Sequence, residues 1–373
     1  MALCDVTFSS RYELRKDLLN NYEKGLLPND TATVVTVNFN AFRLIEFDDK
    51  NGKFTISGYL EVHWIDLRIA ENWNLSSHQS PDILSMYFKE SEVWTPNVLQ
   101  INPYSRSDSE KLKDESIMFF PTGSALMLKG DIFSSECKAD FTYFPHDTQN
   151  CSIYLVVWGY YMEEVILNPY HNKVNMDNYE KNNLWDMGDT RISINILNEK
   201  KDSSKIRVLK IEFEINRRST YYVLFLIMPI VLMEILQVFV FMLPWDCGER
   251  ASYSITVLLS IAVYLTIITE QIPKSSEPNI SVVAKKLFTD LCIGCVVQIF
   301  VIISLHIYNF SQLKHQAITQ TCCRDILIWA QKKDWIAIGH RLDIIFVVIT
   351  FAAIFATNAY LLSNIVIMKN LSL

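Results

Sequence analysis

Four long apolar segments, separated by short polar ones, occupy the second half of the chain. The first covers residues 223–243 and is interrupted only by Glu234 and Gln237. At about 1.5 Å of rise per residue, a helix of that length crosses a hydrocarbon core of about 30 Å. The other apolar runs cover residues 252–269, 287–308 and 344–367. We therefore expect a four-helix membrane bundle, with helices at about residues 221–243, 251–271, 282–308 and 336–367.

The first half instead shows the alternation of polar and apolar residues typical of β-strands. A helical segment at 12–22 comes first, in which Leu14 and Leu18 share one face. Strand-like runs follow at 33–39, 54–64, 116–120, 125–128, 152–157, 191–197 and 206–215. Short strands separated by turn residues favour a two-sheet sandwich. The sequence thus predicts an immunoglobulin-like β-sandwich with an N-terminal helix at residues 1–216, and a helical membrane domain at 217–373.

The charged residues divide the chain at the same point. Residues 1–216 carry 32 acidic and 22 basic side chains, whereas residues 217–373 carry 9 acidic and 12 basic ones. The chain contains no glycine-rich nucleotide fingerprint, and its seven histidines form no metal-binding or catalytic motif. We therefore expect no enzyme activity, no cofactor, no metal site and no nucleic-acid partner.

Basic residues in the short loops predict the orientation in the membrane. The linker at 309–334 holds four basic and two acidic side chains, and Arg250 follows the first apolar segment. Because basic loops remain in the cytoplasm, both chain ends are expected outside the cell. The first residues contain no apolar leader, so we expect this sequence to be that of a mature or engineered form.

Two cysteines of the first half enclose a short loop. Cys137 and Cys151 are separated by thirteen residues, and in an oxidising compartment such a pair is expected to close. Three sequons agree with export, and their asparagines are candidate glycosylation sites: Asn29, Asn74 and Asn150.

Residues of the second apolar segment recur at steps of three and four, so that they share one helical face. They are Glu249, Ser252, Thr256, Leu259, Val263, Thr266 and Glu270. This stripe has carboxylates at its ends, hydroxyls in its lower part and apolar side chains in its middle. A seam between packed helices has the same periodicity, but it does not account for terminal carboxylates and hydroxyls at membrane depth. We interpret the stripe as the lining of a pore.

Several motifs combine into a recognisable set. The cysteine loop contains Phe144, Pro145 and Asp147, Trp158 follows it, and an Arg217-Arg218 pair precedes the first apolar segment. Together with the four apolar segments, these residues resemble those of the Cys-loop receptors, the family of pentameric ligand-gated ion channels. Other motifs are most similar to the nicotinic acetylcholine receptor branch: Trp64, Asp66, Trp94, Pro96, Tyr221, Tyr222 and Pro229.

The resemblance covers nearly the whole chain and implies a multi-pass protein of the plasma membrane. It implies assembly with four further subunits into a homo- or heteropentamer, a small-molecule agonist, and contact with membrane lipid. It also implies that the Cys137–Cys151 loop rests on the segment after the second helix and couples agonist binding to the pore. The residues expected to carry this coupling are Pro145, Asp147, Arg217 and Pro273.

Charge selectivity is expected to come from Glu249. The anion-passing branches of the resembling family carry Pro-Ala-Arg before this helix, whereas this chain has Cys247-Gly248-Glu249-Arg250. A ring of carboxylates in a narrow pore attracts cations and repels anions. We therefore expect monovalent cations to permeate. Leu259 and Val263 are expected to form apolar rings that close the pore by dewetting.

An aromatic cage for a quaternary ammonium ligand is only partly present. By resemblance, Trp158 is the central tryptophan of the cage, and Tyr59 is the residue that a neighbouring subunit supplies. Residues 186–212 contain no aromatic side chain, although the pattern expects two tyrosines there. Acetylcholine is therefore expected to be an inefficient agonist of a homomer. The same segment is basic, since it contains Lys200, Lys201, Lys205 and Arg207, which repels a cation and favours a carboxylate-bearing or zwitterionic ligand. The candidate ligand-binding residues are Tyr59, Ile101, Met127, Trp158, Tyr160, Lys200 and Arg207.

The sequence leaves two alternatives to an agonist-gated channel. A carboxyl in apolar surroundings at Glu234, together with the acidic first half, is compatible with proton gating. A non-conducting accessory or adhesion subunit would use the extracellular half as a binding module. Cys292 and Cys295 have the spacing of metal ligands, but inside an apolar helix we interpret them as packing residues.

Overall fold

The computed structural model describes residues 2–105, 115–198, 205–244, 248–271, 280–318 and 325–371. Within these ranges, side chains are described at all residues except 2–9, 198, 271, 310–318, 325–336 and 365–371. The chain forms two compact units. The first comprises Met1–Ala139 and Thr148–Asn216, and the second comprises Asp140–Asp147 and Arg217–Leu373.

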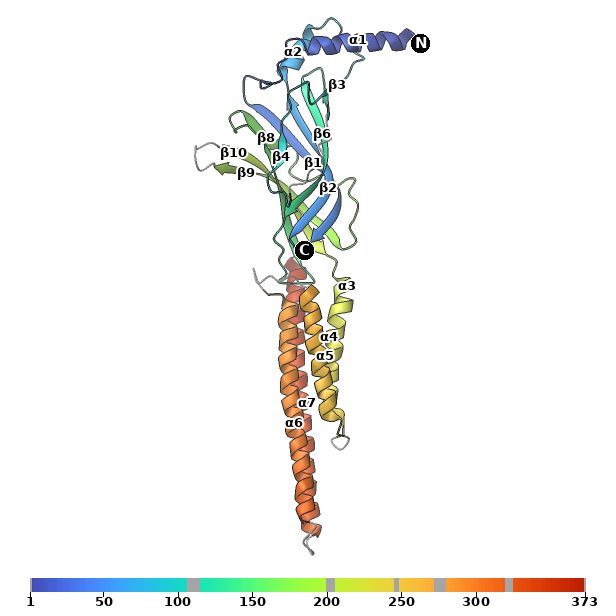
Figure 1. Cartoon of the computed structure of the whole chain (residues 1–373), viewed down its shortest axis with the longest axis vertical. Coiled ribbons are helices and arrows are strands. Elements are labelled where there is room, and N and C mark those ends of the chain that lie inside the picture. Colours follow the sequence, from blue (N-terminus) through green and yellow to red (C-terminus); the bar gives the residue numbers. More distant parts are fainter. Residues whose placement is uncertain are drawn as a thin grey trace. The chain divides into compact units, whose positions relative to one another are not determined.

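The first unit is a sandwich of two β-sheets, as the sequence predicts (Figure 1). The six-stranded sheet has the order β3-β5-β6-β2-β1-β8, and the four-stranded sheet has the order β4-β7-β10-β9. The strands are β1 (Thr33–Asp48), β2 (Lys53–Ile65), β3 (Met86–Lys89), β4 (Val98–Gln100), β5 (Ser116–Phe119), β6 (Ser124–Glu136), β7 (Thr148–Val157), β8 (Val165–Pro169), β9 (Trp185–Asn198) and β10 (Lys205–Arg217). In β2, buried and less buried positions alternate along most of the strand, because one face of the sheet covers the core.

Aromatic side chains hold the two sheets together. Phe39 of β1 contacts Phe213 of β10 in an edge-to-face arrangement, with 5.7 Å between ring centroids. Phe213 also lies 5.3 Å from Phe54 of β2, and Phe39 lies 5.1 Å from Phe133 of β6. Aromatic pairs of this kind stabilise a core by about 0.5–1.5 kcal/mol each beyond the area they bury.

Two helices accompany the sandwich, α1 (Ala2–Leu18) and α2 (Leu67–Leu75). Leu14 and Leu18 of α1 are fully buried. Asp66 caps the N-terminus of α2, because its carboxylate accepts a hydrogen bond from the backbone N–H of Arg68 at 3.1 Å. The Tyr22 hydroxyl donates to the same carboxylate at 2.6 Å. Asp66 therefore has a structural role in connecting α2 to the segment after α1.

The predicted disulfide between Cys137 and Cys151 is present. Cys137 directly follows β6 of the six-stranded sheet, and Cys151 lies in β7 of the four-stranded sheet. Both cysteines are buried in the sandwich core. The bond therefore joins the two sheets covalently.

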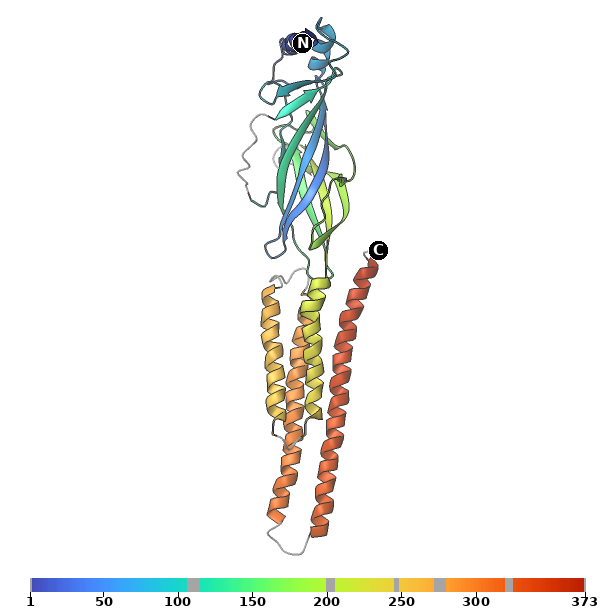
Figure 2. The ribbon, with the colours of Figure 1, turned by 90° about the vertical axis from the view of Figure 1, so that its right-hand side faces the viewer.

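The second unit contains four stretches of helix that are long and apolar enough to cross a membrane, which confirms the prediction of four spans. They cover Thr220–Met242, Arg250–Glu270, Val282–Asn309 and Ala337–Asn364. The first consists of α3 (Thr220–Tyr222), a π-helical turn η1 (Val223–Ile227), α4 (Met228–Phe239) and a 3₁₀ turn η2 (Val240–Met242). The others belong to α5 (Arg250–Gln271), α6 (Val282–Ile318) and α7 (Asp325–Leu371). Figure 2 shows the four lying side by side.

Several helix ends differ from the sequence-based expectation. Helix α1 ends at Leu18 rather than near residue 22. Helices α6 and α7 extend into the predicted linker at 309–334, because α6 continues to Ile318 and α7 begins at Asp325. Hydropathy marks only the apolar part of a helix, so a continuation into polar residues escapes it.

We predict that the disulfide contributes about 3 kcal/mol to the stability of the sandwich, the value expected for a loop of about 15 residues. Replacing Cys137 and Cys151 together by Ser should lower the free energy of unfolding by this amount. That is a large share of a typical total of about 5–15 kcal/mol. Thermal unfolding of the purified full chain in detergent and surface labelling in cells measure the loss. Cys292→Ser removes a thiol that is not in a disulfide and is the control; equal behaviour of both variants would contradict the prediction.

Candidate functional site

One face of α5 and of the residue before it is left uncovered by the other helices of the second unit. All members of the predicted stripe lie on this face and are exposed: Glu249, Ser252, Thr256, Leu259, Val263, Thr266 and Glu270. Leu259 and Val263 expose 61% and 50% of their surface. On the opposite face, Val257, Ile261 and Ile268 are buried. Helix α5 therefore presents a continuous face that ends in a carboxylate on both sides.

The hydroxyl groups of α5 are oriented by the helix backbone. The Thr256 hydroxyl donates to the carbonyl oxygen of Ser252 at 2.8 Å, and the Thr266 hydroxyl donates to that of Val263 at 2.6 Å. The Ser260 hydroxyl donates in the same way to the carbonyl oxygen of Thr256. Since a hydroxyl has one proton and two lone pairs, each oxygen keeps acceptor capacity once its proton is engaged. Such oxygens suit contact with a hydrated cation.

Glu249 and Arg250 point in different directions, although they are neighbours in the sequence. Glu249 is exposed, whereas Arg250 is fully buried among the other helices. Glu249 directly precedes α5 and its carbonyl oxygen accepts a helical hydrogen bond from the backbone N–H of Tyr253 at 2.9 Å, so its side chain follows the spacing of about 100° per residue that separates it from Arg250. The positive charge of Arg250 therefore does not lie on the exposed stripe.

The tip of the cysteine loop, Asp140–Asp147, belongs to the same unit as the helices. Arg217 and Asp147 form a buried, two-pronged ion pair, with Nε to Oδ1 at 2.7 Å and Nη2 to Oδ2 at 3.1 Å. The Arg217 guanidinium also lies over the rings of Phe144 and Tyr222, at 5.1 and 5.3 Å from their centroids. Cation–π contacts and a bidentate carboxylate together fix the arginine geometry.

The loop tip also contacts the start of α6. The backbone N–H of Val282 donates to the carbonyl oxygen of Thr142 at 2.9 Å. Pro145 is buried beside Phe144 and Asp147. Of the four residues expected to couple the halves, the structure brings together Pro145, Asp147 and Arg217, whereas Pro273 lies outside the described residues.

A buried cluster of charged side chains inside the helical bundle was not predicted as a whole. The Lys286 ammonium of α6 contacts the Glu234 carboxylate of α4 and bonds Asp290, with Nζ to Oδ2 at 2.8 Å. The Asn358 amide of α7 donates to the other Glu234 oxygen at 2.7 Å. Glu234 is therefore a paired carboxylate rather than the isolated one that suggested proton sensing. The signal that could have found its partner is the i, i+4 pair of Lys286 and Asp290 inside an apolar segment.

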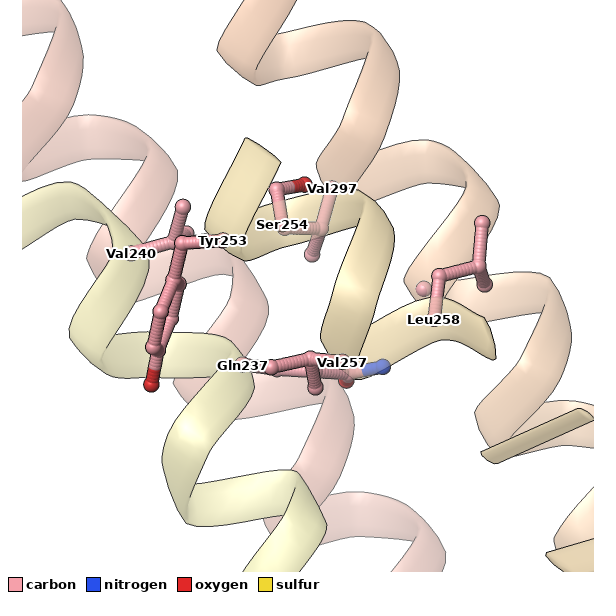
Figure 3. Close-up of a pocket in the computed structure, with 8 residues that line it drawn as sticks. Gln237, Val240, Tyr253, Ser254, Val257, Leu258 and Val297 are labelled. Atoms are coloured by element: carbon pink, nitrogen blue, oxygen red, sulfur yellow. The ribbon is translucent and has the colours of Figure 1, made fainter. Parts of the chain in front are cut away.

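A small cavity lies next to this cluster, between α4, η2, α5 and α6 (Figure 3). It has room for about one water molecule. Gln237 lines it and is buried, and neither amide atom has a hydrogen-bond partner among the described residues. Gly294 of α6 makes space for this side chain, because a Cβ there would lie 2.7 Å from the Gln237 amide nitrogen. The other lining residues are Val240, Tyr253, Ser254, Val257, Leu258 and Val297.

Four of the predicted ligand-binding residues lie on or beside the four-stranded sheet. Trp158 follows β7 and exposes 62% of its surface, and Ile101 follows β4 and exposes 40%. The Tyr160 hydroxyl accepts a hydrogen bond from the Trp94 indole at 3.1 Å, which fixes this half-buried aromatic ring two residues after Trp158. Arg207 lies on β10, which pairs with β7. Lys200 lies outside the described residues.

The remaining two ligand candidates lie on the six-stranded sheet. The ring of Tyr59 of β2 packs against that of Phe42 at a tilt, with 5.3 Å between centroids, and burial, followed by the charge of Glu61, raises the pKa of its phenol. Met127 of β6 is buried in the core, so its assignment to the ligand site is wrong. Strand alternation places its neighbour Leu128 on the outer face instead, where it exposes 52% of its surface.

The three sequon asparagines differ in their accessibility. Asn74 and Asn150 are exposed. Asn29 is half-buried, and its amide nitrogen donates to the carbonyl oxygen of Ile65 at 3.1 Å. A glycan fits the first two sites more easily than the third. Among the described residues, no cluster of three or more side chains could hold a metal ion.

Comparison with known proteins matches both units. A family model described as the neurotransmitter-gated ion-channel ligand binding domain covers residues 11–219, and one described as the neurotransmitter-gated ion-channel transmembrane region covers residues 226–316. The chain is 28% identical to Ligand-gated ion channel 4 of Caenorhabditis briggsae over 302 residues, which are 79% of this chain and 47% of that protein.

Two acetylcholine receptor subunits are also similar to this chain. Acetylcholine receptor subunit alpha-1-A of Xenopus laevis is 28% identical over 308 residues, covering 81% of this chain and 66% of that subunit. Neuronal acetylcholine receptor subunit alpha-2 of Gallus gallus is 31% identical over 273 residues, which are 70% of this chain and 49% of that subunit. The matched part thus spans about half to two thirds of these relatives.

We predict that Lys286→Met destabilises the helical bundle by about 3–5 kcal/mol, because it leaves buried carboxylates without their cation. Lys285→Met is the matched control, since Lys285 is the adjacent residue of α6 and is exposed. Thermal unfolding of the full chain in detergent compares the two. Adding Glu234→Gln and Asp290→Asn to Lys286→Met removes the unpaired charges and should recover most of the loss. Equal stability of the Lys286 and Lys285 variants would refute the assigned role of the cluster.

Proposed function

Because the chain belongs to the neurotransmitter-gated ion-channel family, we propose that it is a subunit of a pentameric, ligand-gated, cation-selective channel. The observation that carries this proposal is the exposed stripe of α5, with Glu249 at one end. The subunit lies in the plasma membrane with both chain ends outside, contacts membrane lipid and assembles with four further subunits. The resulting channel opens on binding a small-molecule agonist and passes monovalent cations.

The stripe supports a shared pore because its chemistry suits water rather than lipid. Ser252, Thr256 and Glu270 are exposed at membrane depth or at its edge. Carboxylates and hydroxyls are costly in hydrocarbon and are tolerated where they line a water-filled path. Five copies of α5 around one axis turn each exposed position into a ring. The ring of Glu249 carboxylates then concentrates cations at one mouth.

The apolar middle of the stripe supplies the proposed gate. Leu259 and Val263 lie one helical turn apart, and both are exposed within one chain. Rings of these side chains expel water when the pore is narrow, which blocks ions without filling the pore with side chains. Opening then requires the five copies of α5 to move apart at this level.

Agonist binding is proposed at the outer surface around Trp158. Trp158 is exposed there, and the Trp94 indole fixes Tyr160, two residues after Trp158. Ile101 is also exposed but lies opposite Tyr154, four residues from Trp158 along the chain. The basic strand β10 runs close to this region, because the backbone N–H of Met162, four residues after Trp158, donates to the carbonyl oxygen of Lys205 at 3.1 Å. Lys205 and Arg207 are basic residues of that strand. A basic strand repels a quaternary ammonium and attracts a carboxylate. The proposed agonist is therefore a small molecule that carries a carboxylate, alone or beside a cation.

We predict that Glu249 sets charge selectivity. Glu249→Gln should lower the ratio of sodium to chloride permeability by about tenfold, the low end of the enrichment that a like-charged cleft produces. Reversal potentials in external sodium chloride dilutions, recorded from oocytes that express the full chain, measure this ratio. Glu163→Gln neutralises an exposed carboxylate of the first unit and is the control. Wild-type selectivity in the Glu249 variant would remove this residue from the filter, and a silent wild type under a broad agonist screen would count against a homomeric channel.

Acetylcholine is predicted to be an inefficient agonist of the homomer. Each aromatic face missing from a cage costs about 0.5–2 kcal/mol of cation–π attraction, so the loss of the two tyrosines expected in residues 186–212 weakens binding by roughly 5- to 10³-fold. Concentration–response curves for acetylcholine and for small amino acids and carboxylates test this on the same oocytes. Robust opening by micromolar acetylcholine, abolished by Trp158→Ala, would contradict it.

A further inference from the structure

The first residue of α5 is a fully buried arginine. The Arg250 guanidinium donates from Nε to the carbonyl oxygen of Val240 at 3.1 Å and from Nη2 to that of Phe241 at 3.3 Å. It also lies over the Phe241 ring, 5.4 Å from the centroid. These contacts tie the start of α5 to the end of the preceding span. They satisfy several N–H donors but supply no compensating negative charge.

That charge comes from α7, the last helix of the chain. The Asp343 carboxylate lies 3.1 Å from Nη2 of Arg250 and accepts a second bond from Nη1 at 3.2 Å. Two hydroxyls of α6 orient the carboxylate, since Ser304 donates to Oδ1 at 2.6 Å and Tyr308 donates to Oδ2 at 3.2 Å. Asp343, more than ninety positions after Arg250 in the sequence, thus supplies the carboxylate that pairs with the Arg250 cation.

Helix α7 approaches α6 closely enough to build this site because of a glycine. A Cβ at Gly339 would lie 2.7 Å from the Tyr308 ring, so the ring occupies the space that a side chain would take. Gly339 and Asp343 are four residues apart and share one face of α7. The glycine therefore lets Tyr308 reach Asp343.

A buried guanidinium without its carboxylate is strongly disfavoured and moves toward water where its side chain is long enough. The neighbouring Glu249 is exposed on the stripe. In the proposed pentamer, the water of the pore mouth surrounds Glu249 and thus lies within one residue of the Arg250 backbone. A released Arg250 side chain would place one positive charge per subunit beside each Glu249 carboxylate, and the net charge of the mouth would fall toward zero.

We propose that Asp343 is a positioning residue for charge selectivity. By keeping the Arg250 cation inside the bundle, Asp343 leaves the ring at the pore mouth to the Glu249 carboxylates alone. This inference rests on the proposed function of a cation-selective channel and adds a determinant that lies outside the pore, on the last helix.

The test compares Asp343→Asn with wild type in oocytes expressing the full chain. We expect the sodium-to-chloride permeability ratio to fall about tenfold and the single-channel cation conductance to fall with it, as expected for a weakened ring of like charge. The double variant Asp343→Asn with Arg250→Gln carries no cation to release and should recover both quantities. Arg341→Gln is the control, because it changes the charge of α7 by one unit, with the opposite sign, at an exposed position two residues away.

A merely structural role for Asp343 gives a different result. It reduces the number of channels at the surface, leaves the reversal potential and unitary conductance of the remaining channels unchanged, and predicts no rescue by Arg250→Gln. Should Asp343→Asn fail to reach the surface, Arg250→Gln alone decides. We expect wild-type conductance for it, whereas a clear increase would show that Arg250 already faces the pore and would overturn the proposal.

The proposed function and this inference fail in distinguishable ways. A wild-type channel that prefers chloride refutes the proposed cation selectivity. A cation-selective wild type whose Asp343→Asn variant keeps the same reversal potential refutes the positioning role alone.

Discussion

A polar group at membrane depth needs either a partner or water, and this constraint organises the whole second unit. The helices α4, α6 and α7 satisfy it by exposing mainly apolar side chains. Examples are Leu232, Leu236, Phe239, Ile299, Ile302, Val348, Phe351 and Phe355. Helix α5 does not, since hydroxyls and carboxylates lie on its uncovered face. The simplest way to satisfy α5 is a water-filled axis shared with other copies, which is why the proposed pore is assigned to this helix.

The same constraint explains the two ionic clusters inside the bundle. Charged side chains that cannot reach water pair across helices, Glu234 with Lys286 and Arg250 with Asp343. Both clusters include a residue of α7, Asn358 in one and Asp343 in the other. Helix α7 is therefore fastened at two positions fifteen residues apart rather than held by apolar contact alone. Pairs of this kind are weak evidence for net stability but strong evidence for a defined arrangement, because breaking one partner is costly.

Much of this architecture could be predicted from the sequence, and the failures have physical causes. Long alternating strands such as β2 and long apolar helices have strong periodic signals, whereas β3, β4 and β8 are five residues or shorter and were missed. Met127 was placed in the ligand site, although a shift of one position moves a strand residue to the other face. The exposed stripe of α5 follows from spacing alone. The partners of Glu234 and Arg250 do not, because which helix packs on which is a long-range property of the fold.

The connectivity of the two units suggests how binding reaches the pore. The chain passes from one unit to the other at residues 139/140, 147/148 and 216/217. Asp147 is the last residue before the second crossing and Arg217 the first after the third, and their buried ion pair joins these two crossings. The first two crossings lie between Cys137 and Cys151. The disulfide joins these two cysteines within the sandwich core and thereby holds the two ends of the loop together. Arg217 is the last residue of β10, so this strand carries one partner of the Asp147 ion pair. In the proposed channel, the basic strand nearest to Trp158 is thus the strand that ends at this ion pair.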